Sequence, residues 1–297
     1  MTSAAPRVVF VVRETDYELL LARHATRQQT RFFLQTRGQD LDALEAAHDQ
    51  FQQVLQTARS TVPTEWRQAL VKRHGLDRFL FAKDDVVVAI GQDGLIANVA
   101  KYLDGQPVIG INSAPEQFDG VLMQVPLASL AISFKAAIST DPDLEVRTMA
   151  EARLDSGERL FALNEVFIGH RSHQSARYTL EAGERSERQS SSGVIVATGT
   201  GATGWARSIM EATNTKLPLS PTEPALGFFV REPFPSVATG TSLRSGKVGA
   251  AALRIRSQMN EGGVIFADGI EQDYLSFDWG RELTVGIADR RLRLVRV

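Results

Sequence analysis

The residues best suited to chemistry follow an apolar run that ends in two glycines with one carboxylate between them. The run covers residues 86–90, and the turn after it consists of Gly91, Gln92, Asp93 and Gly94. Glycines let the backbone approach a bulky anion closely, and a helix that starts at about Leu95 would direct its free N–H groups at that anion. Because an anion repels a carboxylate, Asp93 is expected either to hold a cation or to accept a proton from a hydroxyl.

The same tetrapeptide is also an ordinary turn between a strand and a helix, and taken alone it favours that interpretation. Its position favours the functional one. In open α/β sheets, ligands bind beyond the carboxyl ends of the strands, and this turn follows such an end.

A second candidate places an amide and a carboxylate at the start of another strand. Asn164 and Glu165 precede the apolar stretch at 166–168. The amide of Asn164 could hydrogen-bond the polar edge of a ligand, because this short side chain carries both a donor and an acceptor. The alternative is an asparagine that caps its own turn, beside a solvated Glu165.

A third candidate is a loop of small residues between an apolar strand and a helical pattern. The strand is expected at Val194–Thr198, and the loop of small residues consists of Thr198, Gly199, Thr200, Gly201, Ala202, Thr203 and Gly204. Backbone and threonine oxygens in such a loop can reach a flat heterocycle or a ribose with little steric hindrance. A flexible linker is the alternative, and the helical pattern that begins at once at Trp205 makes it the weaker one.

Three weaker signals lie in the second half of the chain. Asp268 follows the strand at 263–267 and could equally belong to a β-turn. Arg231 could supply a cation to phosphates, although an exposed pair with Glu232 is the commoner arrangement. His170 and His173 lack an obvious third ligand, so no metal site is predicted from protein residues alone.

The elements before residue 125 alternate between strands and helices. Strands are expected at Val8–Val12, Val86–Ile90 and Pro107–Ile111, and helices at Asp40–Ala58 and Leu95–Leu103. A further short helix is predicted at Trp66–Arg73. Strand, helix and strand in this order indicate a right-handed parallel crossover, so this half predicts an open, mostly parallel α/β sheet.

The pattern changes after Pro126. A helical stretch at 127–139 is followed by short segments with strand propensity at 145–149, 159–168, 177–181, 194–198, 225–230, 247–255, 263–267 and 283–297. The predicted fold class is therefore an α/β N-terminal domain with an open, mostly parallel sheet plus a β-rich C-terminal domain. The predicted division is residues 1–125, residues 126–275, and C-terminal strands at 276–297 that can return to the N-terminal domain.

Composition sets further bounds on function. The chain has 297 residues, 43% of them hydrophobic and 23% charged, which is ordinary for a globular protein of two domains. A net charge of -2 predicts no nucleic-acid partner, and the absence of cysteine excludes disulfides, thiol catalysis and thiolate metal sites. No leader peptide and no long apolar segment are recognised, so a cytoplasmic protein without a membrane partner is expected.

In this order, the three main motifs resemble those of the NAD kinase family. Residues 91–95 resemble its Gly-Gly-Asp-Gly-Thr loop, Asn164 and Glu165 its Asn-Glu/Asp motif, and residues 198–205 its Thr-Pro-Thr-Gly-Ser-Thr-Ala-Tyr segment. The resemblance covers about residues 80–270. It is greatest to the mitochondrial-type branch, through the segments at 107–112, 164–169, 191–193, 198–201 and 220–233.

The resemblance implies transfer of a phosphoryl group from ATP to the 2′-hydroxyl of NAD, with Mg²⁺ or another divalent cation, by a homo-oligomer, expected to be a dimer. The adenosine part of NAD would bind between the domains. Asp93 would be the catalytic residue, in contact with the acceptor ribose hydroxyl. The residues implied to bind the nucleotides are Gly91, Gln92, Gly94, Asn164, Glu165, Thr198, Thr200, Gly201, Ala202, Thr203 and Asp268.

Two positions depart from the family pattern. Gln92 stands where the family has glycine, and Leu95 stands where it has threonine, which removes a hydroxyl. Two alternatives stay open. These departures motivate the first, a sensor that binds NAD or NADP without catalysis. The second, a related kinase that phosphorylates another hydroxyl acceptor such as a lipid or a sugar, is motivated by the Gly-Asp-Gly turn, which lipid kinases share.

Overall fold

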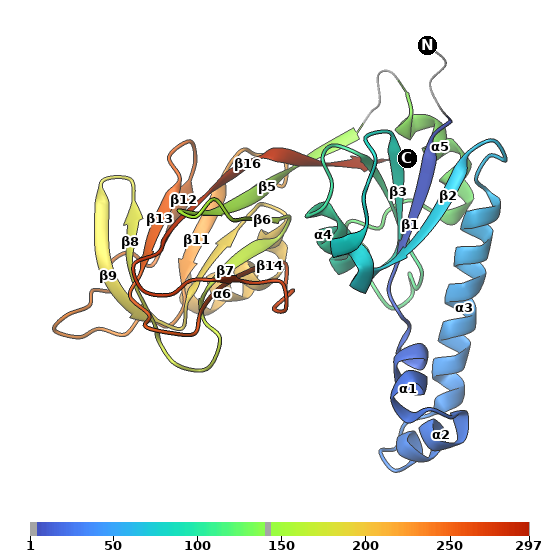
Figure 1. Cartoon of the computed structure of the whole chain (residues 1–297), viewed down its shortest axis with the longest axis horizontal. Helices are drawn as coiled ribbons and strands as arrows, with labels where there is room; N and C mark the ends of the chain where they lie inside the picture. Colours follow the sequence, from blue (N-terminus) through green and yellow to red (C-terminus); the bar gives the residue numbers. More distant parts are fainter. Residues whose placement is uncertain (1–4, 140–143, 297) are drawn as a thin grey trace. The chain divides into compact units, whose positions relative to one another are not determined.

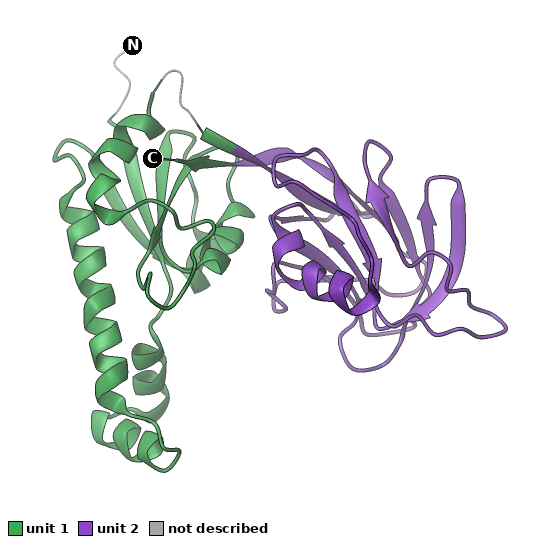
Figure 2. Ribbon diagram, turned by 180° about the vertical axis from the view of Figure 1, so that it is seen from behind, with its two compact units in different colours: residues 1–145, 293–297 green, residues 146–292 purple. Residues whose placement is uncertain are grey.

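The structure is a computed structural model that describes residues 5–139 and 144–296. The chain forms two compact units (Figure 2). The first consists of residues 1–145 and 293–297, and the second of residues 146–292. Strands β5 (Leu144–Leu154) and β16 (Glu282–Val295) each contribute residues to both units.

The first unit is built on a parallel sheet. Its strands lie in the order β2 (Arg67–Lys72), β1 (Arg7–Val12), β3 (Asp85–Gly91) and β4 (Pro107–Asn112), with the end of β16 parallel to β4 (Figure 1). All seven residues of β3 are buried. A parallel strand is covered on both faces, which explains why this stretch is a continuous apolar run rather than an alternating one.

Helices cover both faces of this sheet. Alternate side chains such as Phe10, Val88 and Ile109 pack against Phe51 and Phe134. Those two phenylalanines belong to α3 (Leu41–Ser60) and α5 (Leu130–Ala137). The opposite face packs against α4 (Asp93–Ala100), which contacts β1, β3 and β4. The remaining helices are α1 (Asp16–His24), α2 (Arg27–Gln35) and the 3₁₀ helices η1 (Arg73–Arg78) and η2 (Leu127–Ser129).

The predicted short helix at Trp66–Arg73 is wrong. Residues 67–72 form β2, which pairs in parallel with β1, with Leu70 opposite Phe10. Only Val71 of this strand is buried. A run of three apolar residues, Ala69 to Val71, fits either structure, and pairing with the neighbouring strand decides between them. Helix α4 also begins at Asp93, two residues before the predicted start.

The second unit consists of two antiparallel β layers. One contains β6 (Arg159–Ala162), β8 (Ala176–Ala182), β9 (Arg185–Ser191), β13 (Leu253–Ser257) and parts of β5 and β16. The other has the order β12 (Ser245–Val248), β11 (Leu226–Val230), β10 (Val194–Ala197), β7 (Glu165–His170), β14 (Gly263–Ala267) and β15 (Leu275–Ser276).

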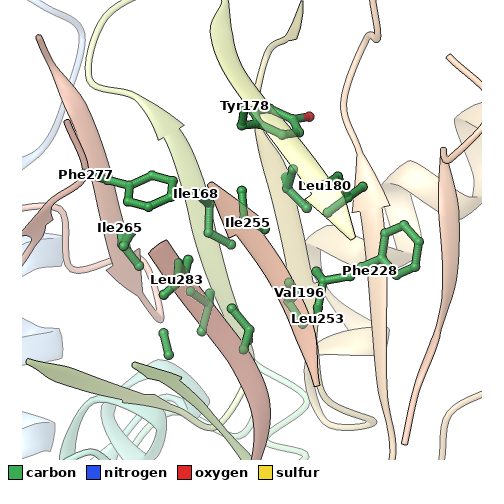
Figure 3. Packing of buried hydrophobic residues seen from close by; sticks show 14 of the residues in the cluster. Ile168, Tyr178, Leu180, Val196, Phe228, Leu253, Ile255, Ile265, Phe277 and Leu283 are labelled. Atoms are coloured by element: carbon green, nitrogen blue, oxygen red, sulfur yellow. The ribbon is translucent and has the colours of Figure 1, made fainter. Parts of the chain in front are cut away.

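The core of the second unit lies between these two layers. Ile168, Val196 and Ile265 of one layer meet Leu180 and Ile255 of the other (Figure 3). The outer face of the β7–β10–β11 layer packs against α6 (Trp205–Thr213), which follows the 3₁₀ helix η3 (Gly201–Thr203). These strands are therefore buried on both faces, and the loops at the ends of β7 and β10 rest on a rigid layer.

The predicted fold class is confirmed: a mostly parallel α/β sheet with helices on its faces, followed by antiparallel β structure. Within residues 5–139 and 144–296, no helix combines the length and the apolar character that crossing a bilayer requires.

Candidate functional site

The residues singled out from the sequence fall into two groups, one in each compact unit. The group in the first unit lies at the carboxyl end of β3, where Gly91 stands opposite Asn112 of β4. Gly91 has a φ of 151°, a backbone conformation that residues with a side chain rarely adopt. The chain can therefore turn from β3 directly into α4 at the edge of the sheet where α/β proteins bind ligands.

Asp93 is the first residue of α4, and its carboxylate is held by the protein. Its two oxygens accept hydrogen bonds from the backbone N–H groups of Val121 and Leu122, both at 2.9 Å. Asp93 thereby fixes the loop that follows β4. A carboxylate has about four lone-pair sites, so these two bonds leave acceptor capacity for a ligand hydroxyl or a cation.

The neighbours of Asp93 differ in what they offer. Gly94 is exposed, and a Cβ added there would meet no atom within 4 Å, so the fold itself does not require a glycine. A ligand that closely approaches the backbone of Gly94 would require a glycine there. Gln92 occupies the N-cap of α4 without making a capping hydrogen bond, whereas Leu95 is 3% exposed and belongs to the core. At the position where the family motif has a threonine, this chain therefore has a leucine that packs in the core and offers no hydroxyl.

In the second unit, Asp268 braces the turn that carries the Asn-Glu motif. Its carboxylate accepts hydrogen bonds from the backbone N–H groups of Leu163 at 2.9 Å, Asn164 at 2.8 Å and Glu165 at 3.1 Å. Asp268 adopts a φ of 52°, which a non-glycine residue reaches only at a cost. These contacts show that Asp268 holds the backbone of residues 163–165 in place.

The small-residue loop is packed against the same turn. Thr198 is fully buried, and its hydroxyl donates to the carbonyl of Leu163 and accepts from the N–H groups of Thr200 and Gly201. A Cβ on Gly201 would lie 2.1 Å from the carbonyl oxygen of Asn164. Two segments about 35 residues apart therefore form one compact surface, and only glycine fits at the point of contact.

Not all side chains of this loop face the exterior. Thr200 is 5% exposed, and its hydroxyl accepts a hydrogen bond at 3.3 Å from Arg147, a buried residue of β5 that the sequence did not single out. Ala202 is half-buried and Thr203 is exposed. The accessible part of the loop is thus its second half, residues 202–204, whereas Gly201 is buried.

Asn164 and Glu165 are the polar side chains that this surface leaves for a ligand. Both are partly buried, and no described residue hydrogen-bonds either side chain. Burial, and secondarily the charge of Asp268, raises the pKa of Glu165 to about 7. Near neutral pH this carboxyl group can therefore either donate or accept a hydrogen bond.

The described residues contain no group of three or more His, Asp or Glu side chains that could hold a metal ion. The available oxygen donors are single carboxylates such as Asp93. This donor set fits Mg²⁺ delivered with a phosphate-bearing substrate, because proteins commonly hold that ion through one or two carboxylates together with substrate phosphates.

Comparison with characterised proteins identifies relatives of the chain, although no protein-family model matches it. It is 30% identical over 127 residues to the NAD kinase of Chlorobaculum tepidum, and 28% identical over 219 residues to that of Caldicellulosiruptor saccharolyticus. The chain is thus similar to NAD kinases, at modest identity. A third relative, NAD kinase 2, mitochondrial, of Rattus norvegicus, is 26% identical over 254 residues.

The extent of these matches differs. The chain spans less than half of the Chlorobaculum NAD kinase (44%), 60% of the rat protein and 78% of the Caldicellulosiruptor protein. The corresponding shares of this chain are 42%, 68% and 72%.

Solved structures of NAD kinases have the same fold. An NAD kinase from Archaeoglobus fulgidus in complex with ATP covers 98% of this chain, with 93% of its own length aligned, a TM-score of 0.59 and 18% identity. Yeast NADH kinase complexed with NADH covers all of this chain, with 85% of its own length aligned, a TM-score of 0.61 and 16% identity. At these identities the likeness establishes the fold, and the chemistry has to be argued from the residues.

Proposed function

We propose that the chain is an NAD kinase that transfers the γ-phosphoryl group of ATP to the 2′-hydroxyl of NAD, giving NADP. The observation that carries the proposal is the placement of Asp93: a braced carboxylate with spare acceptor capacity, at the start of α4 and beside an open glycine. The order of the motifs and the similarity to NAD kinases support it.

In the proposed reaction the 2′-oxygen forms a bond to the γ-phosphorus. The bond between that phosphorus and the β–γ bridging oxygen breaks, and its electron pair leaves with ADP. The proton of the hydroxyl passes to the carboxylate of Asp93. Phosphoryl transfer needs little covalent help from a protein, so the contribution of Asp93 is to orient and deprotonate the hydroxyl.

The acceptor is proposed to be recognised by the surface of the second unit. The unpaired amide of Asn164 and the carboxyl group of Glu165 would bind polar edges of the adenosine moiety. The exposed half of the loop, with Ala202 and Thr203, would lie against its flat faces. Thr198 and Asp268 would act by holding this surface in shape.

The turn at 91–94 is proposed to hold the triphosphate, with backbone N–H groups at the start of α4 as donors. The Gln92 side chain, free of any capping bond, could donate to a phosphate oxygen. A divalent cation such as Mg²⁺ would be held by those phosphates and would neutralise their charge.

Two finer assignments belong to the same proposal. The first is membership of the mitochondrial-type branch, which the segments quoted from the sequence and the match over 254 residues to the rat protein support. The second is a homodimer, which the family resemblance suggests. Sedimentation of the purified chain measures its oligomeric state directly, and a monomer would contradict the second assignment.

The test is incubation of the purified chain with ATP, Mg²⁺ and NAD, followed by mass spectrometry of all nucleotides. NADP formation is the expected result. Binding of NAD by calorimetry without NADP formation would replace the kinase by a sensor. Phosphate transfer only to a different hydroxyl acceptor, such as a lipid or a sugar, would replace it by a related kinase.

A further inference from the structure

The first unit contains a cavity of about 160 Å³ that the assignments above do not use. It lies at the carboxyl edge of the parallel sheet, where the backbone of Gly91 and Gln92 forms part of its wall. Its other walls come from the loop after β1, from α1 and α3 and from the loop after β4, and they combine polar with aromatic side chains. The aromatic and imidazole side chains that line it are Tyr17, His48, Phe51 and Phe118.

These side chains suit a flat heterocycle. The rings of Tyr17 and His48 lie 5.2 Å apart and are tilted by 47°, and Phe118, which also lines the cavity, is 42% exposed. Nucleobases stack on such faces. The volume is below the roughly 300–1,000 Å³ of sites that enclose a whole drug-sized ligand, so the cavity fits one part of a larger molecule.

Polar groups among the lining residues are able to hydrogen-bond the edge of a base. The imidazole of His48 is fixed by a hydrogen bond of 2.8 Å between its Nδ1 and the hydroxyl of Thr15. Two carboxylates also line the cavity, and each has a basic partner: Glu14 contacts His74 at 2.7 Å, and Asp16 lies 3.8 Å from Arg13. Paired carboxylates of this kind can accept hydrogen bonds from an exocyclic amine.

We propose that this cavity binds the nucleobase of the phosphoryl donor. The inference rests on the proposed function, because it takes the turn at 91–94 as the site of the donor phosphates. A base in the cavity places its phosphates toward that turn, since Gly91 and Gln92 belong to both. The donor class is then a nucleoside triphosphate with an amine-bearing base, and inorganic polyphosphate, which has no base, is a poor donor.

Two neighbouring alanines of α3 provide a matched test. Ala47 lines the cavity, whereas Ala46 does not, and both side chains are exposed on the same helix. Ala47→Phe should fill the cavity and weaken ADP binding at least tenfold by calorimetry, with NAD binding unchanged. Ala46→Phe should leave both affinities at the wild-type value. Because both substitutions add the same side chain to the same helix, an effect on folding alone would not separate them.

A second variant removes stacking without filling the cavity. Phe118→Leu keeps an apolar side chain but loses the aromatic face, and the stacking energy of one base corresponds to about 5–100-fold weaker ADP binding. Tripolyphosphate, which carries the charge of the donor without a base, serves as the control ligand. Its affinity should be the same in the wild type, Ala47→Phe and Phe118→Leu.

The outcomes separate this inference from the kinase proposal. Equal ADP affinity in Ala46→Phe and Ala47→Phe would overturn the nucleobase assignment even if NADP is formed. Tripolyphosphate as a donor equal to ATP would overturn it as well. If ADP binding falls only in Ala47→Phe while the wild type makes no NADP, the cavity binds the base and the kinase proposal fails.

Discussion

Two Asp-Gly turns of this molecule follow buried strands and look alike in sequence, yet their carboxylates make different contacts. Asp93 accepts two backbone hydrogen bonds at the start of a helix, beside a glycine open to the exterior. Asp268 accepts three, in a left-handed backbone conformation. The first turn combines a brace with spare acceptor capacity, and the second is primarily a brace. The two turns teach that the Asp-Gly dipeptide alone does not predict the contacts of its carboxylate, because the residue proposed to react and the residue that braces a turn share it.

The largest expected effect is on turnover at Asp93. Asp93→Asn should lower kcat by about 10²–10⁴-fold, the usual contribution of a positioned base, because the amide cannot take the proton of the hydroxyl. NADP formation at saturating ATP and NAD measures it. Exposed Asp77, mutated to asparagine, is the control and should keep wild-type turnover. A near-normal kcat in Asp93→Asn would contradict the proposed role as a base and would leave Asp93, like Asp268, with a structural role alone.

Asp268 should behave differently. Asp268→Ala leaves three backbone N–H groups without their acceptor, so the KM for NAD should rise about tenfold or more while kcat at saturation changes less. Stability should fall by about 2–4 kcal/mol, since each unsatisfied buried group costs about 1–3 kcal/mol and the loop can relax in part. Asp268→Asn, which keeps one acceptor, should restore part of the KM. A fall in kcat with no change in KM would contradict a positioning role.

The third prediction concerns Glu165, which lies beside Asp268, and the pH dependence of the free energy of unfolding. Its pKa is raised from 4.5 to about 7, so the folded state binds the proton more tightly than the unfolded state, and stability is lost as pH rises from about 4.5 to about 7. Glu165→Gln should therefore be more stable than the wild type at pH 8, by on the order of 2 kcal/mol, with a smaller difference at pH 4.5. Urea unfolding at both pH values measures it.

The control for this measurement is Glu184→Gln, at an exposed turn of the second unit. An equal gain in stability for Glu165→Gln at both pH values would show that the effect comes from packing and not from the charge.

The smallest expected effect concerns the loop between β10 and α6. Thr198→Val keeps the shape of the side chain but removes a hydroxyl that joins one carbonyl and two N–H groups. A loss of about 1–3 kcal/mol is expected by urea unfolding, because two buried donors lose their acceptor. Thr203→Val at the exposed end of the same loop is the control. It removes a hydroxyl that donates to the carbonyl of Thr200 at 2.9 Å but accepts no N–H in the hydrogen bonds described, so it should cost less, and equal losses would contradict the bracing role of Thr198.

The strands with the clearest signals could be predicted because their environment leaves a local pattern. Residues 86–90 are buried on both faces and are uniformly apolar, and β14 was located correctly at 263–267. The segment at 67–72 carries no such pattern, because an edge strand with one buried residue has the same composition as a short helix. Only the partner strand makes it a strand.

The candidate site can likewise be predicted from the sequence only in part. From the sequence alone, the type and order of Asn164, Glu165 and the loop at 198–204 predict a polar ligand. The brace formed by Asp268 could not be predicted, since it joins residues more than 100 positions apart through backbone N–H groups that every residue has. The role of Arg147 was missed for a related reason: it lies within a strand and belongs to no motif.

The strand β16 has a consequence for how this protein is made. Its residues Arg293 and Leu294 pair with Pro107 and Val108, and Arg293 also donates to the carbonyl of Gly105 at 3.0 Å. The first unit thus receives its last strand only after the ribosome has translated all of the second. Until then Pro107 and Val108 of β4 lack their strand partner, whereas Gly110 and Ile111 are already bonded to residues 124–125. An exposed strand edge of this kind favours aggregation. A stop codon before residue 293 would make that transient exposure permanent.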